Sequence, residues 1–125
     1  MRVADSSFIV EGILKEKELL EEDLLTVELA LYETANSIWK HQCILKDLRD
    51  GTPYLAVLLE LIQSGRIRIV RPWSELMRRA YSMASKHNRP VYDTLFAALA
   101  LELDLKLATF DRRQAELMRR ETRGG

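Results

Sequence analysis

The chain has 125 residues, of which 47% are hydrophobic and 30% charged, and its formal net charge is zero. This composition excludes a disordered chain, and the longest apolar run, Leu95–Leu101, is too short to cross a bilayer. A single cysteine, Cys43, excludes an internal disulfide and a cysteine-based zinc site, which predicts a reducing, cytoplasmic environment.

Short strands alternate with helices in the first part of the chain. A strand at Arg2–Ala4 runs into a polar turn, which is not the pattern of a signal peptide. A helix is predicted over Ser6–Lys17, and the acidic stretch Glu16–Asp23 then leads to a second strand at Leu24–Val27. The clearest amphipathic helix follows, over Glu28–Gln42.

The middle of the chain begins with a strong break at Asp50–Pro53. Thr52 is expected to cap the next helix, with Pro53 at its first position and Gln63 at its end. The alternation of apolar and charged residues in Arg66–Val70 predicts a third strand.

The last part of the chain contains a further strand and three helices. The first of these helices, opened by Pro72–Ser74, runs to about His87. Tyr92–Leu103 is apolar on almost every side, which indicates a buried helix. A strand at Lys106–Thr109 precedes a charged helix over Arg112–Glu121. This alternation predicts an α/β fold of one domain, residues 1–125, with a parallel sheet covered on both faces.

Charge is unevenly distributed along the chain. Residues 1–62 carry six Lys and Arg and twelve Asp and Glu, a net charge of −6, whereas residues 63–125 carry thirteen and seven, a net charge of +6. A basic half beside acidic residues is suited to holding the backbone of a polyanion. An ordinary solvated surface accounts for the asymmetry equally well.

Four carboxylates stand beside or within predicted helices: Asp5, Glu33, Asp93 and Asp111. Asp5 and Asp111 follow predicted strands, and the carboxyl ends of parallel strands meet at one edge of a sheet, where ligands bind. The four side chains are therefore candidates for one acidic pocket. Oxygen-rich pockets suit hard divalent cations such as Mg²⁺ and Mn²⁺, which commonly serve phosphoryl chemistry.

Each carboxylate also has an ordinary structural explanation. Asp5 and Asp111 are well placed to cap helices, and Glu33 lies opposite the apolar stripe of its helix, as a surface glutamate does. Asp93 stands at the head of the most apolar helix, where a charge is costly unless it is capped, paired or coordinated.

Taken together, the ordered pattern closely resembles the PIN-domain family of metal-dependent ribonucleases, and in particular its small VapC-type toxins. The segments that carry the resemblance span nearly the whole chain: Val3–Phe8, Glu28–Trp39, Tyr92–Ala100 and Leu107–Arg113. The last two segments, at this separation, are the most specific.

The resemblance implies a three-layer α/β/α fold with a short central parallel sheet and an acidic site at one edge. Asp5, Glu33, Asp93 and Asp111 match the family's acidic quartet, which implies that they bind Mg²⁺ or Mn²⁺ and carry catalysis. Ser7, Asn36 and Thr109 match polar positions near the quartet. Many family members add a strand after the final helix, whereas this chain continues as Arg119–Gly125.

The function implied is metal-dependent hydrolysis of RNA phosphodiester bonds by the toxin of a type II toxin–antitoxin pair. Asp5 and Asp93 are the expected direct metal ligands, Glu33 is expected to orient a water or bind a second ion, and Asp111 to coordinate through water. Arg112 and Arg113 are candidates for guiding the RNA backbone. The implied partners are RNA, an antitoxin protein and a second copy of the chain, with no membrane.

Two other functions are compatible with parts of the pattern. The same fold without catalysis would be a protein-interaction module whose acids only cap helices. A different acidic Mg²⁺ site, that of a phosphatase or a response-regulator receiver, fits less well. Asp5-Ser6-Ser7 lacks the paired acids of the former, and Lys106 begins its strand where the latter has a lysine at the end.

Overall fold

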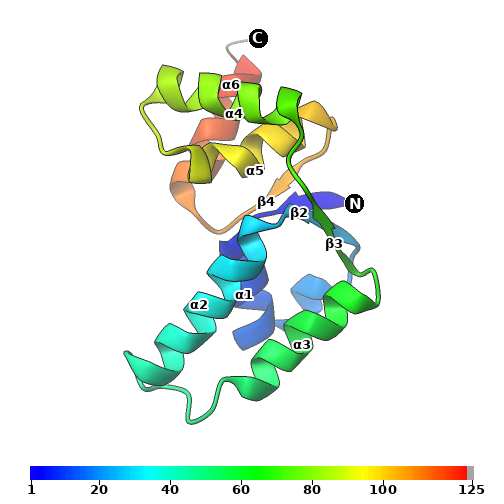
Figure 1. The fold of residues 1–125 in the computed structure, drawn as a ribbon, viewed down its shortest axis with the longest axis vertical. Helices are drawn as coiled ribbons and strands as arrows, with labels where there is room; N and C mark the ends of the chain where they lie inside the picture. Colours follow the sequence, from blue (N-terminus) through cyan, green and yellow to red (C-terminus); the bar gives the residue numbers. More distant parts are fainter. Residues whose placement is uncertain (124–125) are drawn as a thin grey trace.

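The computed structural model describes residues 1–123. Four parallel strands form one sheet in the order β3-β2-β1-β4 (Figure 1). Their bounds are β1 Arg2–Ala4, β2 Leu24–Val27, β3 Ile67–Val70 and β4 Leu107–Ala108. Val3 pairs with Leu25 on one side and with Leu107 on the other, so β1 lies inside the sheet and β4 at its edge. Because all strands run the same way, their carboxyl ends share one side of the molecule.

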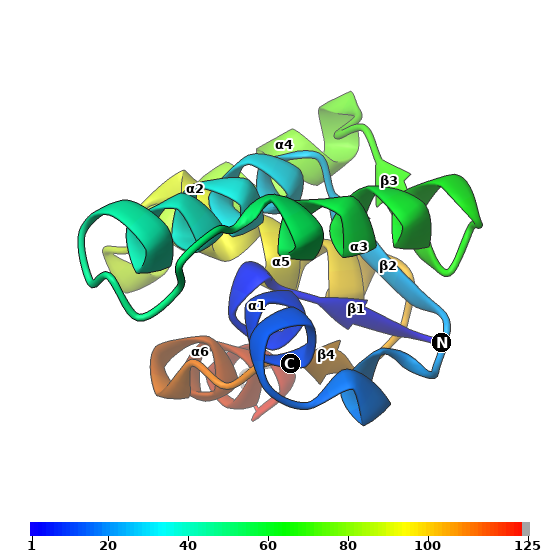
Figure 2. The ribbon, with the colours of Figure 1, turned by 90° about the horizontal axis from the view of Figure 1, so that it is seen from below.

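Six α-helices cover the two faces of this sheet. They are α1 Ser6–Leu14, α2 Leu29–Cys43, α3 Thr52–Gln63, α4 Ser74–His87, α5 Val91–Glu102 and α6 Arg112–Arg123. The first three lie on one side of the sheet and the last three on the other, as Figures 1 and 2 show from two directions. This arrangement confirms the predicted three-layer α/β/α fold with its short parallel sheet.

The core is built around α5, in which every residue from 94 to 100 is buried. The apolar character predicted for this helix is therefore confirmed: α5 lies against β1 and β2 and is flanked by α4 and α6. Buried hydroxyl groups join neighbouring elements within the layers. Thr94 Oγ1 donates to the carbonyl of Ala80 in α4 at 2.7 Å, and Thr26 Oγ1 donates to the carbonyl of Ala4 at 2.6 Å. Each buried hydroxyl thus offsets the cost of leaving water.

The first helix is shorter than the sequence predicts. It ends at Leu14 because the N–H groups of Lys15 and Glu16 both turn back to the carbonyl of Glu11. The acidic stretch that follows contains a short 3₁₀-helix, η1 Lys17–Leu20, which no periodicity had indicated. Its last residue, Leu20, is buried and gives this segment a place in the core.

The start of α3 also differs from the prediction. Thr52 is the first helical residue rather than the cap, and its N–H donates to Oδ1 of Asp50 at 3.0 Å. The side chain that accepts a backbone N–H at the start of α3 is therefore that of Asp50 and not that of Thr52. Pro53 still lies in the first turn, where its missing N–H costs nothing. Across residues 1–123, no helix has both the length and the apolar content needed to cross a membrane.

The contact between α1 and η1 leaves no room for a side chain at Gly12. A Cβ atom there would lie 2.6 Å from Cγ of Leu20. Overpacking of this kind costs about 1–3 kcal/mol, which exceeds the gain of about 1 kcal/mol that alanine brings to a helix. We therefore expect Gly12→Ala to lower the free energy of unfolding by about 1 kcal/mol in urea denaturation. The exposed change Ser85→Ala should have almost no effect, and an equal result for both would refute this packing argument.

Candidate active site

The carboxylate of Asp5 lies where β1 ends and α1 begins, and only 3% of the residue is exposed. Its Oδ1 accepts the N–H of Phe8 at 3.1 Å and the hydroxyl of Ser7 at 2.6 Å. Its Oδ2 accepts the hydroxyl of Thr109 from the far end of the chain. Asp5 therefore caps α1, as the ordinary explanation holds, and also joins segments that are 104 residues apart.

Hydrogen bonds extend this arrangement from Asp5 to Asp111. Ser7 Oγ accepts the N–H of Phe110 at 3.0 Å, and Thr109 Oγ1 accepts the N–H of Asp111 at 2.9 Å. Asp111 in turn accepts the N–H of Arg113 at 2.8 Å through its Oδ1, so it caps α6. The ends of β1 and β4 are thereby fixed together, and Asp111 is held close enough to raise the pKa of Asp5.

Burial is the main reason that the pKa of Asp5 is raised, because a charged carboxylate loses its hydration there. The hydrogen bonds from Ser7, Thr109 and Phe8 partly offset this effect, and the charge of Asp111 adds to it. The site therefore holds a carboxylate whose negative charge is costly in the absence of a counter-charge.

Glu33, in the second turn of α2, is partly buried, and its pKa is also raised. Burial is the largest cause, the Ser6 hydroxyl opposes it, and the charges of Asp93 and Asp5 add to it. Within residues 1–123, Oε1 of Glu33 is buried without a hydrogen-bond partner. The helical wheel placed Glu33 on a surface face, but neighbouring elements cover it and bring it close to two other acids.

Asp93 lies in the first turn of α5. Its backbone carbonyl accepts Nε2 of Gln114 in α6 at 2.8 Å, and its Oδ2 lies 3.8 Å from Nε of Arg89. Arg89 also donates through Nη1 to the carbonyl of Arg113 at 3.3 Å. Arg89 was not among the predicted site residues, although its spacing of four residues before Asp93 was an available signal.

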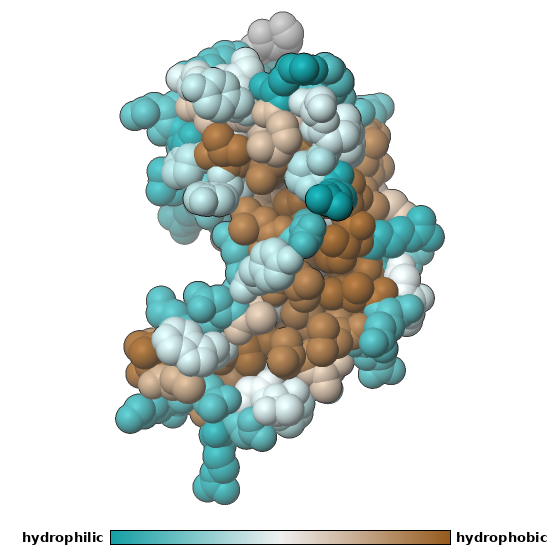
Figure 3. Space-filling model, viewed as in Figure 1, coloured by the Kyte–Doolittle hydropathy of each residue, from teal (hydrophilic) through white to brown (hydrophobic). Residues whose placement is uncertain are grey.

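The structure thus brings Asp5, Glu33, Asp93 and Asp111 to one side of the molecule. This is the side from which α1, α2, α5 and α6 start, and the space-filling view is indented there (Figures 1 and 3). Ser7 and Thr109 take part directly, as expected. Asn36 does not: it is exposed, and among residues 1–123 its side chain makes no hydrogen bond.

The donor set fits a hard divalent cation in its chemistry. All four groups offer carboxylate oxygens, one oxygen of Glu33 is buried and unpaired, and the mutual repulsion seen in the raised pKa values would be relieved by a positive ion. As the side chains stand, no three acidic, imidazole or thiol groups of residues 1–123 are close enough together to hold one ion. Binding would therefore require side-chain rotation toward a common centre, for which the indented surface leaves space.

Comparison with known proteins identifies the family to which this chain belongs. The PIN domain family matches residues 3–119, and the chain belongs to that family. It is similar to Ribonuclease VapC3 of Pyrobaculum aerophilum, with 36% identity over 95 residues, which are 76% of this chain and 71% of that protein.

Two solved structures share the fold at low sequence identity. PAE2754 from Pyrobaculum aerophilum superposes with a TM-score of 0.75 at 17% identity, over 93% of this chain and 83% of that one. Mycobacterium tuberculosis VapC20, described as a Sarcin-Ricin loop cleaving toxin, gives a TM-score of 0.71 at 15% identity, over 93% and 94%. These likenesses show the fold.

The raised pKa values of Asp5 and Glu33 set the sign of a pH effect on stability. The folded protein binds protons at these groups more readily than the unfolded chain does, so their contribution is full below the ordinary values of 3.8 and 4.5 and is lost as pH rises through the raised values. Glu33→Gln removes one buried charge and its repulsion of Asp5. In EDTA at pH 7 we expect the variant to gain about 1 kcal/mol in free energy of unfolding.

The difference should fade as the pH falls below 4.5, the ordinary pKa of glutamate, because Glu33 is then neutral in both the folded and the unfolded protein. Denaturation in urea at several pH values measures it, with the exposed change Glu60→Gln as the matched control. A loss of stability at neutral pH on replacing Glu33 would contradict the proposed electrostatic strain.

Proposed function

We propose that the protein is an endoribonuclease that hydrolyses RNA phosphodiester bonds with the help of Mg²⁺ or Mn²⁺. The observation that carries this proposal is the pair of buried or partly buried carboxylates, Asp5 and Glu33, whose charges are costly and whose neighbours, Asp93 and Asp111, are also acidic. Membership of the PIN-domain family and the similarity to a protein named as a ribonuclease support the same function.

If a divalent cation binds here, Asp5 and Asp93 would hold it directly, Glu33 would orient a water or hold a second ion, and Asp111 would contribute through water. A metal in this position would supply a water of lowered pKa and would stabilise negative charge on the phosphate. Ser7, Thr109 and the N–H of Phe8 fix the Asp5 carboxylate, so one ligand is oriented before any ion arrives. A purely capping role for the acids does not account for the buried, unpaired oxygen of Glu33.

We further propose that the protein is the cytoplasmic toxin of a type II toxin–antitoxin pair and forms a homodimer. The VapC names of a relative and of a structural neighbour support the class. Ile44, Leu45 and Leu59 are large apolar side chains that are exposed in the segment from the end of α2 through α3. Exposed apolar side chains of this kind suit contacts with an antitoxin or a second copy.

Cleavage of RNA is the direct test of the proposed activity. We expect the purified protein to cut single-stranded or structured RNA with Mn²⁺ or Mg²⁺ and not with EDTA. Asp93→Asn should lower the rate by about 100-fold or more, because it removes a direct ligand. Asp104→Asn is the matched control, since Asp104 is exposed in a left-handed turn that asparagine also adopts. Cleavage that survives in Asp93→Asn or in EDTA would rule out the assignment.

Metal binding can be tested separately from activity. A ligand that binds only the folded state raises its stability, by about 2.7 kcal/mol at 100 times the dissociation constant. We expect Mn²⁺ to raise the melting temperature of the unmodified protein and of Asp104→Asn, and to have little effect on Asp93→Asn. Equal shifts in all three proteins would place the ion elsewhere.

A further inference from the structure

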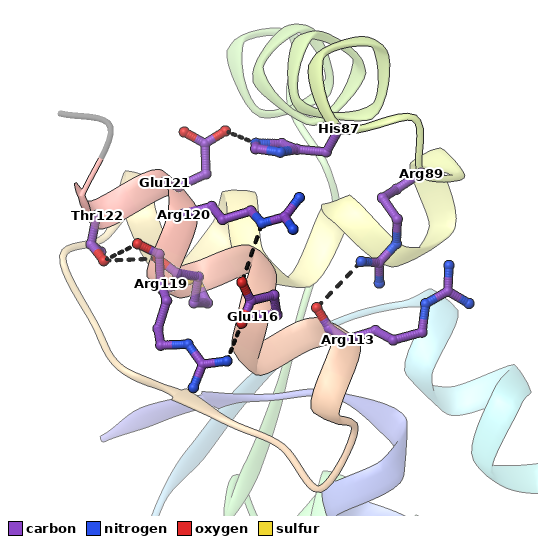
Figure 4. A network of polar contacts seen from close by, with 9 residues as sticks. His87, Arg89, Arg113, Glu116, Arg119, Arg120, Glu121 and Thr122 are labelled. Atoms are coloured by element: carbon purple, nitrogen blue, oxygen red, sulfur yellow. Dashed lines mark hydrogen bonds and ion pairs between the residues drawn. The ribbon is translucent and has the colours of Figure 1, made fainter.

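A cavity of about 350 Å³ lies on the α4–α5–α6 side of the molecule, beside the acidic side chains. Five arginines, Arg89, Arg112, Arg113, Arg119 and Arg120, line it together with a single carboxylate, Glu116. Figure 4 shows Arg89 reaching down from the turn between α4 and α5, while Arg113 and Arg120 extend from α6 into the same gap. We call this feature the basic cavity.

The five guanidinium groups of the basic cavity pair with only two carboxylates, Asp93 and Glu116, which leaves an excess of positive charge. Glu116 pairs with both Arg119 and Arg120, which lowers its pKa, so one negative charge is shared between two guanidinium groups. Among residues 1–123, no carboxylate pairs with Arg112 or Arg113. A concave surface with such an excess of guanidinium groups attracts an anion.

The rest of the cavity wall is held in place by contacts that leave these arginines available. His87 is nearly buried, and its Nε2 lies 2.9 Å from Oε1 of Glu121, which fixes the end of α4 against α6. The Arg89 side chain is only 13% exposed, and its Nε is buried without a hydrogen-bond partner within residues 1–123. His87 and Arg89 therefore form a fixed back wall of the cavity, and the four arginines of α6 are exposed along its rim.

Two contacts join the basic cavity to the acidic centre, which is the group formed by Asp5, Glu33, Asp93 and Asp111. Arg89 lines the cavity and lies 3.8 Å from the carboxylate of Asp93. Arg113 lines the cavity, and its N–H donates to the carboxylate of Asp111 at 2.8 Å. A phosphate held at the carboxylates by a cation would thus have a region of positive charge next to it, into which the following phosphate can extend.

We propose that the basic cavity binds a backbone phosphate of the RNA next to the one that is cut. The inference rests on the proposed ribonuclease function, which supplies an RNA strand at Asp93 and Asp111, and it adds where that strand leaves the acidic centre. Guanidinium forks match phosphate oxygens, and this cavity offers charge rather than a surface for reading base edges. The subsite therefore strengthens binding of any RNA sequence and does not select among bases.

Salt dependence of RNA binding tests the subsite without requiring cleavage. The probe is a fluorescently labelled single-stranded oligouridine, titrated with the protein in EDTA over a range of salt concentrations. Each phosphate contact with a single strand contributes about 0.7 to the slope of log K against log salt. We expect Arg113→Gln/Arg120→Gln to lower that slope by about 1.4 and to weaken binding roughly tenfold. The double variant should bind an oligoadenylate more weakly by the same factor, because the subsite does not select among bases.

Two matched variants make the test decisive. Arg68→Gln removes one exposed positive charge on β3, at the opposite edge of the sheet from β4, and should change the slope little. Glu116→Gln removes the only carboxylate in the cavity and should tighten binding, a gain that misfolding cannot produce. An unchanged slope in the double variant, an equal effect of Arg68→Gln, or weaker binding by Glu116→Gln would each overturn the inference.

The binding result is independent of the cleavage result. If RNA is cut but the double variant keeps the full slope, the subsite is wrong and the ribonuclease proposal stands. If no RNA is cut under any metal but the slope changes as expected, the phosphate site stands without the catalytic proposal. Competition by inorganic pyrophosphate as strong as that by the oligonucleotide would overturn the assignment to RNA in favour of a small free phosphate.

Discussion

The hydrogen bonds around the Asp5 carboxylate are the constraint on which the rest of this structure depends. One buried side chain caps α1, receives a hydroxyl from the end of β4, and lies close to the charges of Glu33 in α2 and of Asp111, which caps α6. A buried carboxylate is tolerated only when its oxygens are satisfied, and here the Phe8 N–H and the Ser7 and Thr109 hydroxyls satisfy them. The contacts that join the ends of β1 and β4 therefore also position the carboxylate of Asp5 in the site.

The acidic centre is stabilised at one group and strained at another. Asp5 has its full set of donors, whereas Glu33 has a buried oxygen without one and is repelled by Asp93 and Asp5. Unfavourable local arrangements of this kind are retained where they serve function. The basic cavity has the opposite sign, and Arg89 connects the two regions through Asp93. The molecule therefore presents adjacent negative and positive surfaces although its overall charge is zero.

Much of this could be predicted from the sequence, because local pattern was sufficient. The bounds of β2 and the buried nature of α5 agree with the predictions from alternation and apolar content. The end of α1 was not predicted because it depends on which carbonyl accepts the N–H groups of Lys15 and Glu16. The η1 segment was missed because its reason to fold, the packing of Leu20 against Gly12, is tertiary.

The site itself was predictable by residue type but not by environment. A helical wheel describes only one helix, so it could not decide between a surface position and the site for Glu33, which neighbouring elements partly bury. The same limit applies to Asn36, which shares a helix with Glu33 yet stays exposed. The convergence of Arg89 with the arginines of α6 could not be read from the sequence, since it depends on the angle at which α4 and α6 pack.

The hydrogen bond between Asp5 and Thr109 also has a consequence for synthesis of the protein. The ribosome makes the chain from its N-terminus, so Asp5 is synthesised well before Thr109, its hydrogen-bond partner 104 residues later. Until that segment emerges, β1 lacks its neighbour β4 and Asp5 lacks one of its donors. The nascent polypeptide would therefore hold Asp5 without the Thr109 hydroxyl and without Asp111 beside it, so the acidic side of the molecule is completed only when the segment after α5 has been made.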